Sequence, residues 1–314
     1  HVRSRRQRQM CIRDRGRDMI KVLGLGDNVV DKYMHIHTMY PGGNALNIAV
    51  TAQIMGAQAA YLGVFGDDDA GMHVYDTIRK MGVNTLHCRF KKGENGYSEV
   101  KLVDGDRTFI GSNQGGVSKE HPLDLTELDY AYIAQYDLCH TSIFSYTEPY
   151  LERLSQMSTF LSMDFSNRYD DEYLKKNCPY IDCAAISCGN ASKDDVEEEI
   201  KKIVSYGCRH IVIATLGSRG AVVYVDGKIY EQSSCLIKAV DTMAAGDSFI
   251  ASFLIHYLEG MKDVREFPAN SGKNGVTTIS EYKDFCVKSS LYKAAIFASQ
   301  QCQREGSFGY GKEF

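Results

Sequence analysis

The sequence predicts an α/β protein: a doubly wound, mostly parallel β-sheet with helices on both faces, and a small β layer beside it. Two observations support this fold class. From residue 125 onward, segments typical of strands and of helices alternate, and between residues 88 and 111 the pattern changes to strict polar–apolar alternation. With 314 residues, 44% of them hydrophobic, the chain can form one large domain or two modest ones.

The N-terminal third is predicted to contain two strand–helix units followed by a hairpin. Residues 20–26 form an apolar strand that ends in glycines, and a helix over 44–54 follows. A strand over 59–64 and an amphipathic helix over 70–81, which ends at Gly82, make the second unit. Asp104-Gly105 between two alternating runs is a strong hairpin signal. Together with an extended piece over 32–40, this hairpin predicts a small antiparallel layer set apart from the main sheet.

The remainder of the chain is predicted to build the parallel sheet. Strands are expected at 138–141, 160–165, 183–186 and 210–215, with helices at 150–158 and 193–206. This alternation indicates βαβ units. A hairpin of 221–225 and 228–232, a polar insertion over 262–278 and a last helix over 285–301 complete the order.

The first eighteen residues differ from the rest, with seven Arg and two Asp. One interpretation is a basic arm for nucleic acid or a membrane surface. We prefer a disordered or non-native leader, because residues 1–18 lack any periodicity and residues 19–24 look like a natural start of the first strand. The folded domain is therefore expected to cover 19–314, and its acidic balance argues against a nucleic-acid partner.

Composition also bears on location. The ten cysteines are scattered without a C-x-x-C pair or zinc-ligand spacing, so we expect reduced thiols in a cytoplasmic protein. No apolar run approaches the roughly 20 residues that span a bilayer, and we expect no membrane partner.

The most informative segment is 241–249, in which Ala244, Ala245 and Gly246 stand between Asp241 and Asp247, directly before an apolar helical pattern. Small residues at a helix start leave the first backbone N–H groups accessible, and the helix dipole makes this end attractive to phosphate. A carboxylate there, Asp247, is placed to take a proton from an attacking hydroxyl. The alternative, an ordinary capped core helix, is the better interpretation of this segment taken alone.

Two polar segments near the N-terminus suit a ligand rich in hydroxyls. Gly43 and the preceding glycine stand directly before a helix that carries Asn47, while Asp27 and Asp31 follow the first strand. Alone, these segments equally fit a turn with an Asn cap and a solvated loop.

A third segment, with Thr215, Gly217 and Gly220, follows a buried strand and suits a nucleotide phosphate or ribose, although by itself it is only a turn. Two nucleotide-binding motifs are excluded. Val29 replaces the third glycine of a dinucleotide fingerprint, and no Walker G-x-x-x-x-G-K-[ST] motif occurs.

Taken in this order, the Gly-Gly…Asn, Thr-x-Gly-x-x-Gly and Asp-Thr-x-x-Ala-Gly-Asp segments resemble the ribokinase (PfkB) family of carbohydrate kinases over essentially all of residues 19–314. The resemblance implies a ribokinase-like fold, with a small β lid from about 32–41 and 88–115, and ATP-dependent phosphorylation of a sugar hydroxyl with Mg²⁺. It also implies site residues: Asp247 as catalytic base, the amides of Ala244, Ala245 and Gly246 as anion hole, Thr215, Gly217 and Gly220 along ATP, and Asp31, Gly43 and Asn47 on the sugar, with Asp27 beside them. Asp241 is expected to help bind a monovalent cation, K⁺, if this member uses one.

Within the family, the chain is most similar to fructoselysine 6-kinases, on the segments 26–33, 129–137, 164–166 and 241–253. The implied reaction is transfer of a phosphoryl group to the 6-hydroxyl of a fructosamine such as fructoselysine. Alternatives are a kinase of fructose, ribose or a nucleoside, and a non-catalytic sugar- or nucleotide-binding protein. The sequence does not name the amino-acid part of the substrate.

The chain departs from the family pattern at two places. Ala244 stands where a glycine is usual, so we expect its φ to be negative. The family's Asn-x-x-Glu motif is absent near residues 187–190, so we expect Mg²⁺ to be held mainly by ATP and water. Phe109 and Ile110 of the lid are expected either to form a homodimer contact or to pack on the main sheet.

Overall fold

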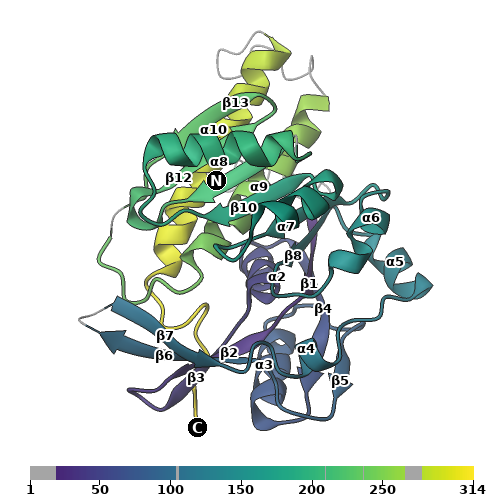
Figure 1. Ribbon diagram of the computed structural model, residues 1–314, viewed down its shortest axis with the longest axis vertical. Coiled ribbons are helices and arrows are strands. Elements are labelled where there is room, and N and C mark those ends of the chain that lie inside the picture. The colour runs from purple at the N-terminus through teal and green to yellow at the C-terminus, as the bar shows by residue number, and fades with distance from the viewer. Residues whose placement is uncertain (1–18, 104–105, 209, 236, 266–277) are drawn as a thin grey trace, which may run out of the picture.

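Two β-sheets organise the chain, a nine-stranded one and a five-stranded one. The computed structural model describes residues 19–103, 106–208, 210–235, 237–265 and 278–314 (Figure 1). The leader 1–18, the Asp104-Gly105 turn and most of the polar insertion lie outside the described residues.

The large sheet is parallel apart from its last hairpin. Its strand order is β13 (Lys228–Gln232), β12 (Ala221–Val225), β11 (Ile211–Thr215), β10 (Cys183–Ser187), β9 (Phe160–Asp164), β8 (Leu138–Ser142), β1 (Lys21–Gly26), β4 (Gln58–Gly66) and β5 (Arg89–Lys91). Only the pairs β11–β12 and β12–β13 are antiparallel. The central strands are buried almost throughout, as expected of a parallel sheet covered on both faces.

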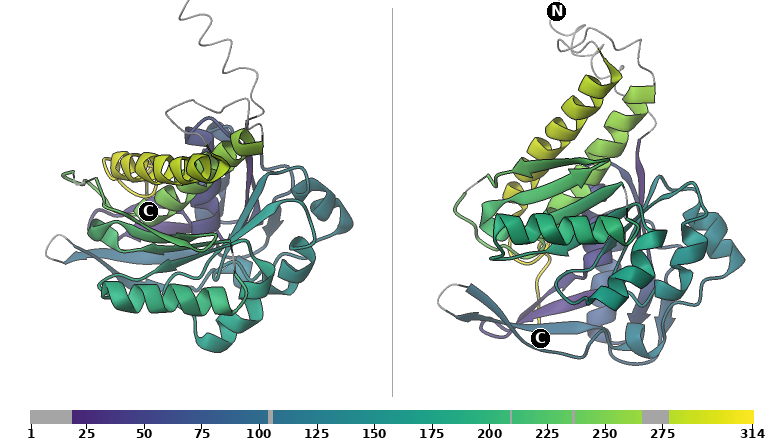
Figure 2. Two further views of the ribbon diagram at one scale, coloured as in Figure 1. Left: turned by 90° about the horizontal axis from the view of Figure 1, so that it is seen from above. Right: turned by 45° about the horizontal axis from the view of Figure 1, so that its top comes forward.

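Helices cover both faces of this sheet, which confirms the predicted doubly wound fold. One apolar core contains α2 (Asn44–Ile54), α3 (Asp69–Lys80), α9 (Ala245–Arg265) and α10 (Ile279–Gln301). The other contains α4 (Val117–Glu120), α5 (Glu127–Ile133), α6 (Leu151–Leu154), α7 (Asp171–Asn177) and α8 (Lys193–Ser205). Figure 2 shows α10 and α8 on opposite faces.

The second sheet differs from the expected antiparallel layer. Its order is β14 (Lys312–Glu313), β3 (Thr38–Gly42), β2 (Val29–Tyr33), β6 (Tyr97–Val103) and β7 (Asp106–Ser112), and β2 pairs with β6 in parallel. The expected lid boundary at residue 88 is wrong, because β5 pairs with β4 in the large sheet. Strand β14 was not predicted, since a two-residue strand leaves no periodicity to detect.

Several helix boundaries also differ from prediction. The helix expected over 150–158 is a 3₁₀ turn (Glu148–Tyr150) followed by the short α6. Helix α10 begins at Ile279, earlier than the predicted residue 285, because Thr278 and Glu281 form a capping box. Helices α5 and α7 were not predicted; each is only seven residues long.

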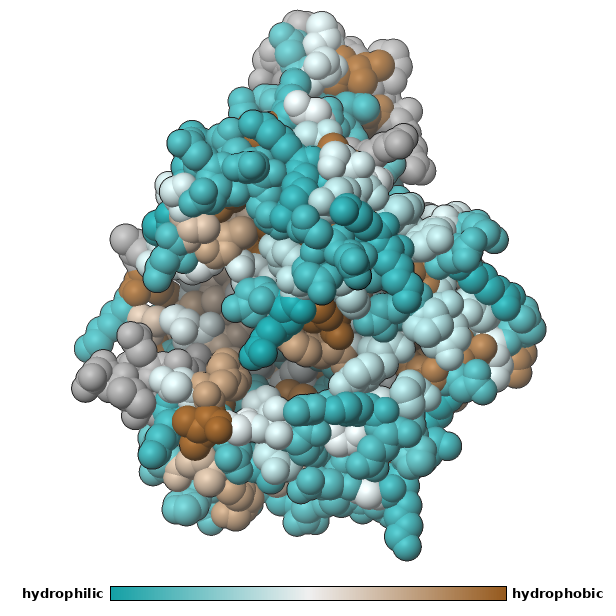
Figure 3. Space-filling model, in the orientation of Figure 1, coloured by the Kyte–Doolittle hydropathy of each residue, from teal (hydrophilic) through white to brown (hydrophobic). Residues whose placement is uncertain are grey.

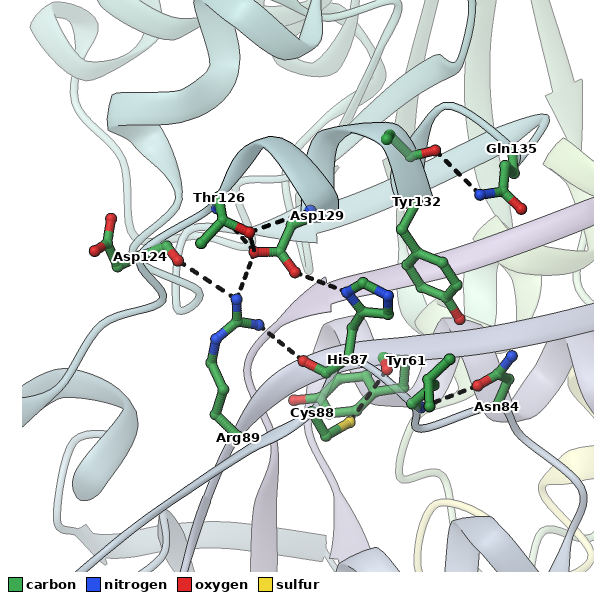
Figure 4. A network of polar contacts seen from close by, with 12 residues as sticks. Tyr61, Asn84, His87, Cys88, Arg89, Asp124, Thr126, Asp129, Tyr132 and Gln135 are labelled. Atoms are coloured by element: carbon green, nitrogen blue, oxygen red, sulfur yellow. Dashed lines mark hydrogen bonds and ion pairs between the residues drawn. The ribbon is translucent and has the colours of Figure 1, made fainter.

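A buried polar network joins α5 to β5 (Figure 4). The Asp129 carboxylate, 2% exposed, accepts hydrogen bonds from His87, Arg89 and both the backbone and hydroxyl of Thr126. Burial by itself would raise the pKa of Asp129, but these donors outweigh it and lower the pKa to about 2. The His87 ring stacks on Tyr132 at 4.0 Å. The network therefore fixes helix α5 against the edge of the large sheet.

The cysteines of the described part of the chain, nine in all, are free thiols and mostly buried, as predicted. Within the same residues, none of the helices combines the length and apolar character that a bilayer crossing requires.

Candidate active site

Two predicted site residues lie at the edge of the large sheet where its parallel strands end: Asp27 follows β1 and Thr215 ends β11. Asp164, which was not predicted as a site residue, ends β9 at the same edge. Carboxyl ends of neighbouring parallel strands meet at one edge of a sheet, which is where ligands bind in such folds. The N-termini of α2 and α9 reach the same edge, as the side-chain contacts below show.

Helix α2 is tied to strand β1 by one carboxylate. The backbone N–H groups of Asn44 and Ala45 donate to Asp27 at 2.6 and 3.2 Å. The hydroxyls of Ser142 and Ser145 donate to the same carboxylate at 2.7 and 2.8 Å. With four protein donors, Asp27 holds the helix in place; the sequence-based expectation had placed it beside the sugar.

Gly43 begins this helix in a conformation that only glycine adopts without strain. Its φ is +116°, and a Cβ would lie 2.7 Å from the Asn28 Cα. The glycine therefore lets the first turn of α2 pass directly over the loop that follows β1.

Asp247 lies in the first turn of α9, as predicted, and both of its oxygens are held by side-chain amides of α2. Asn44 Nδ2 donates to Oδ1 at 2.8 Å and Asn47 Nδ2 donates to Oδ2 at 2.7 Å. Burial, reinforced by the charges of Asp164 and Asp27, raises the pKa of Asp247 to about 8, although the two amides lower it. A carboxylate with this pKa is a competent proton acceptor near neutral pH.

Asn44, Asp164 and His140 belong to the same cluster, and no residue motif predicted their roles. Asn44 Nδ2 also donates to Asp164 Oδ2 at 2.7 Å, and His140 Nε2 lies 2.9 Å from Asn44 Oδ1. Burial raises the pKa of Asp164 to about 6, against the lowering effect of hydrogen bonds from the Ser166 backbone and Asn44. No cation forms an ion pair with Asp164 or Asp247 among the residues the structure covers.

The segment before α9 differs from expectation in one respect. Ala244 has a φ of +55°, so the predicted negative φ is wrong. The family's usual glycine fits this left-handed conformation, which costs an alanine roughly 1 kcal/mol. The space beside Gly246 is open, because a Cβ placed there would meet nothing closer than Thr215 Oγ1 at 4.0 Å. The Ala245 N–H donates to the Thr242 carbonyl at 3.3 Å, a long bond.

Thr215 thus brings the expected nucleotide segment beside the helix N-terminus. Gly217 begins a single 3₁₀ turn (Gly217–Arg219) shortly after β11 and Gly220 follows it, and both glycines have positive φ. Arg219 donates to the backbone carbonyls of Gly189 and Ala191 at 2.7 Å. The turn is therefore anchored to the loop in which the Asn-x-x-Glu motif would have fallen.

Asp31 enters from the second sheet, on β2. A Cβ on Gly42 would lie 2.7 Å from Asp31 Oδ2 and 3.3 Å from Ser307 Oγ, so these two side chains converge beside the start of α2. Ser307 Oγ and Asn47 Oδ1 are buried and have no hydrogen-bond partner. Buried polar atoms of this kind are rare and call for a ligand or water. Ser307 was missed by sequence reasoning because a lone serine in a loop carries no pattern.

The Asp241 carboxylate joins three segments of the chain. It accepts hydrogen bonds from the Tyr33 hydroxyl at 2.7 Å, the Met243 backbone at 2.7 Å and the Gly306 backbone at 2.8 Å. Met243 also packs against the small apolar cluster that Tyr33, Tyr40 and Val100 form in the second sheet. The surface is hollowed between the second sheet and the large domain (Figure 3).

A sequence profile for the pfkB family of carbohydrate kinases matches residues 16–267. The chain belongs to this family. Its members are sugar phosphotransferases.

Individual relatives agree with this assignment. Fructosamine kinase FrlD of Bacillus subtilis is 36% identical over 297 residues, covering 93% of this chain and 94% of its own. Fructoselysine 6-kinase of Escherichia coli is 33% identical over 237 residues, covering 76% and 89%. The structure of Arabidopsis thaliana ribokinase complexed with ribose and ATP matches with a TM-score of 0.73 at 18% identity, covering 94% and 96%. The ribokinase-like fold is thereby confirmed.

Proposed function

We propose that this kinase transfers the γ-phosphoryl group of ATP to the 6-hydroxyl of a fructosamine such as fructoselysine. The observation that carries the proposal is Asp247, held by two amides in the first turn of α9 beside open space at Gly246. The names of the two relatives above favour a fructosamine acceptor over the alternatives of fructose, ribose or a nucleoside.

In the proposed mechanism, Asp247 removes the proton of the attacking hydroxyl. The amides around Ala244, Ala245 and Gly246 stabilise the charge on the transferring group, as N–H groups at a helix start can. Thr215, Gly217 and Gly220 would lie along ATP. General-base removal typically costs 10²–10⁴-fold in rate.

The sugar would lie between the second sheet and α2. Asp31, Gly43 and the free acceptor Asn47 Oδ1 would contact its hydroxyls, and Ser307 Oγ offers a further donor. Asp27 contributes by holding α2.

Two ions belong to the proposal. The described residues contain no cluster of three His, Cys, Asp or Glu side chains that could hold a metal. We therefore propose that Mg²⁺ arrives bound to ATP and keeps several waters. Monovalent-cation binding at Asp241 stays a prediction, which comparison of rates in KCl and in tetramethylammonium chloride tests. A homodimer through the second sheet likewise stays a prediction, for sedimentation to test.

The decisive experiment measures ADP release with magnesium, ATP and fructoselysine, beside equal concentrations of fructose and ribose. We expect the highest kcat/KM for fructoselysine, and Asp247→Asn should bind ligands but lose at least about 10²-fold in kcat. A preference for fructose or ribose would change the proposed acceptor but leave the proposed phosphoryl-transfer mechanism unchanged. If folded protein that ATP still stabilises against heat releases no ADP with any acceptor, the result would favour a non-catalytic binding protein.

A further inference from the structure

We propose that Asn44 and His140 are positioning residues: His140 locks the Asn44 side-chain amide in the one orientation that bridges Asp247 to the second buried carboxylate, Asp164. This inference rests on the proposed function, since it assigns Asp247 the role of base. Neither residue is expected to touch the reacting atoms.

The Asn44 side chain is a junction of four elements. Its residue begins α2, and its single NH₂ group donates to Asp247 on α9 at 2.8 Å and to Asp164 at the end of β9 at 2.7 Å. Its carbonyl oxygen lies 2.9 Å from His140 Nε2 on β8. An amide has two N–H donors, so one is available for each carboxylate, and every polar atom of the side chain is used.

The hydrogen-bond pattern determines the state of His140. Because Asn44 Oδ1 can only accept, His140 Nε2 must carry the proton and donate. His140 Nδ1, 3.0 Å from Ser162 Oγ, then accepts from that hydroxyl. The ring is fully buried, and burial lowers the pKa of His140 to about 3, so it stays neutral.

This arrangement prevents the Asn44 amide from flipping. A flip would turn Oδ1 toward two carboxylates and leave the NH₂ group facing the Nε2–H of His140. The titratable groups that face Asn44 are Asp27, Asp164, Asp247 and His140. Three of them are acids, so the Asn44 donors are what holds Asp164 and Asp247 at a fixed separation without a cation.

Loss of the Asn44 hydrogen bonds should therefore change both the pKa and the position of Asp247, the proposed base. Without the Asn44 donor, Asp247 keeps one amide and faces Asp164 unscreened, so its ionised form becomes less favourable. Misplacement of a catalytic group by about 1 Å can cost on the order of 10²-fold. The raised pKa and the misplacement both lower turnover, but only the change in pKa shifts the pH profile of the reaction.

The test compares Asn44→Leu with Asn177→Leu. Asn177 is a matched control, since it is a buried amide that donates to the Tyr173 carbonyl on α7, away from the site. We expect Asn44→Leu to lose roughly 10²-fold in kcat and to shift the acid limb of the kcat/KM profile to higher pH. Asn177→Leu should leave both within about threefold. An unchanged kcat and pH profile in folded Asn44→Leu would overturn the inference.

The histidine is tested by a pair of variants and by NMR. His140→Gln retains a donor for Asn44 Oδ1 and should keep most of the activity, whereas His140→Leu should approach Asn44→Leu. Long-range ¹H–¹⁵N spectra of the wild-type protein should show a neutral Nε2–H tautomer of His140 between pH 6 and 8. A proton on Nδ1 would overturn the inference, and this readout does not depend on turnover. Wild-type protein that phosphorylates no acceptor would refute the proposed function instead.

Discussion

Removal of the Asp164 charge should move the pH dependence of the reaction to lower pH. Asp164 and Asp247 accept hydrogen bonds from the same nitrogen at 2.7 and 2.8 Å, which puts the two oxygens about 5 Å apart for N–H bonds at ~120°. At an effective dielectric constant of about 20, two unit charges at that distance interact by roughly 3 kcal/mol, or about two pKa units. The pKa of Asp164 is about 6 and that of Asp247 about 8, so Asp164 is ionised while Asp247 titrates.

As the proposed base, Asp247 is active only when its carboxylate is ionised. The value of kcat/KM should therefore rise as the pH rises through the raised pKa of Asp247. In Asp164→Asn the neighbouring charge is gone, the ionised form of Asp247 is easier to reach, and the midpoint should fall by about one to two pH units.

The assay is a kcat/KM profile from pH 5 to 9.5, measured by ADP release with saturating ATP. Asp182→Asn is the control, because Asp182 is a partly buried carboxylate whose pKa is also raised by burial but which precedes β10, at the opposite end of the strands. It should leave the midpoint unchanged. The electrostatic reasoning would be refuted if the midpoint of the Asp164→Asn profile lay within 0.3 pH units of the wild-type midpoint while the Asp182→Asn control also stayed unchanged.

Three further changes have defined outcomes. Ala244→Gly should raise the free energy of unfolding by about 0.5–1 kcal/mol in urea titrations, because it relieves a left-handed alanine; a loss of stability would contradict this. Gly43→Ala should cost at least about 2 kcal/mol more than Gly56→Ala, since both have positive φ but only the first puts a Cβ against backbone; equal losses would be inconsistent with the steric argument. Asp129→Asn should cost about 2 kcal/mol of unfolding free energy at pH 7 and less as the pH falls toward 2, because a carboxylate with a lowered pKa stabilises the fold only while it is ionised. Glu127→Gln, which breaks an exposed ion pair, should cost far less, and a pH-independent loss in Asp129→Asn would count against the network.

The fold and the place of Asp247 in the first turn of α9 could be predicted because each leaves a local pattern. Alternating strands and helices specify a parallel sheet, and small residues before an apolar helical repeat mark the start of α9 and the position of Asp247. The boundary of the second sheet could not be predicted in this way. Residues 89–91 form a strand of only three residues, whose sequence would suit the edge of either sheet. Only the pairing of β5 with β4 shows that it belongs to the large sheet.

The hydrogen-bonded cluster around Asn44 could not be predicted from the sequence for a different reason. Asn44, His140 and Asp164 meet only when β8, β9 and α2 are placed in register, and single residues on three separate elements have no spacing to detect. The same holds for Asp27, whose sequence position fits a sugar contact but whose donors come from α2 and two serines.

The separation of the Asp247 surroundings from Asp31, which lies on the second sheet, has an evolutionary consequence. Every side chain that holds Asp247 in place belongs to the large domain, whereas Asp31 comes from the second sheet, which is built from separate strands. In the proposed mechanism, substitutions around Asp31 that keep Tyr33, which donates to Asp241 ahead of α9, leave both amide donors to Asp247 in place. A lineage with this architecture can then change the molecule it phosphorylates by altering the wall of the site that the second sheet supplies, while the residues proposed for phosphoryl transfer are inherited unchanged.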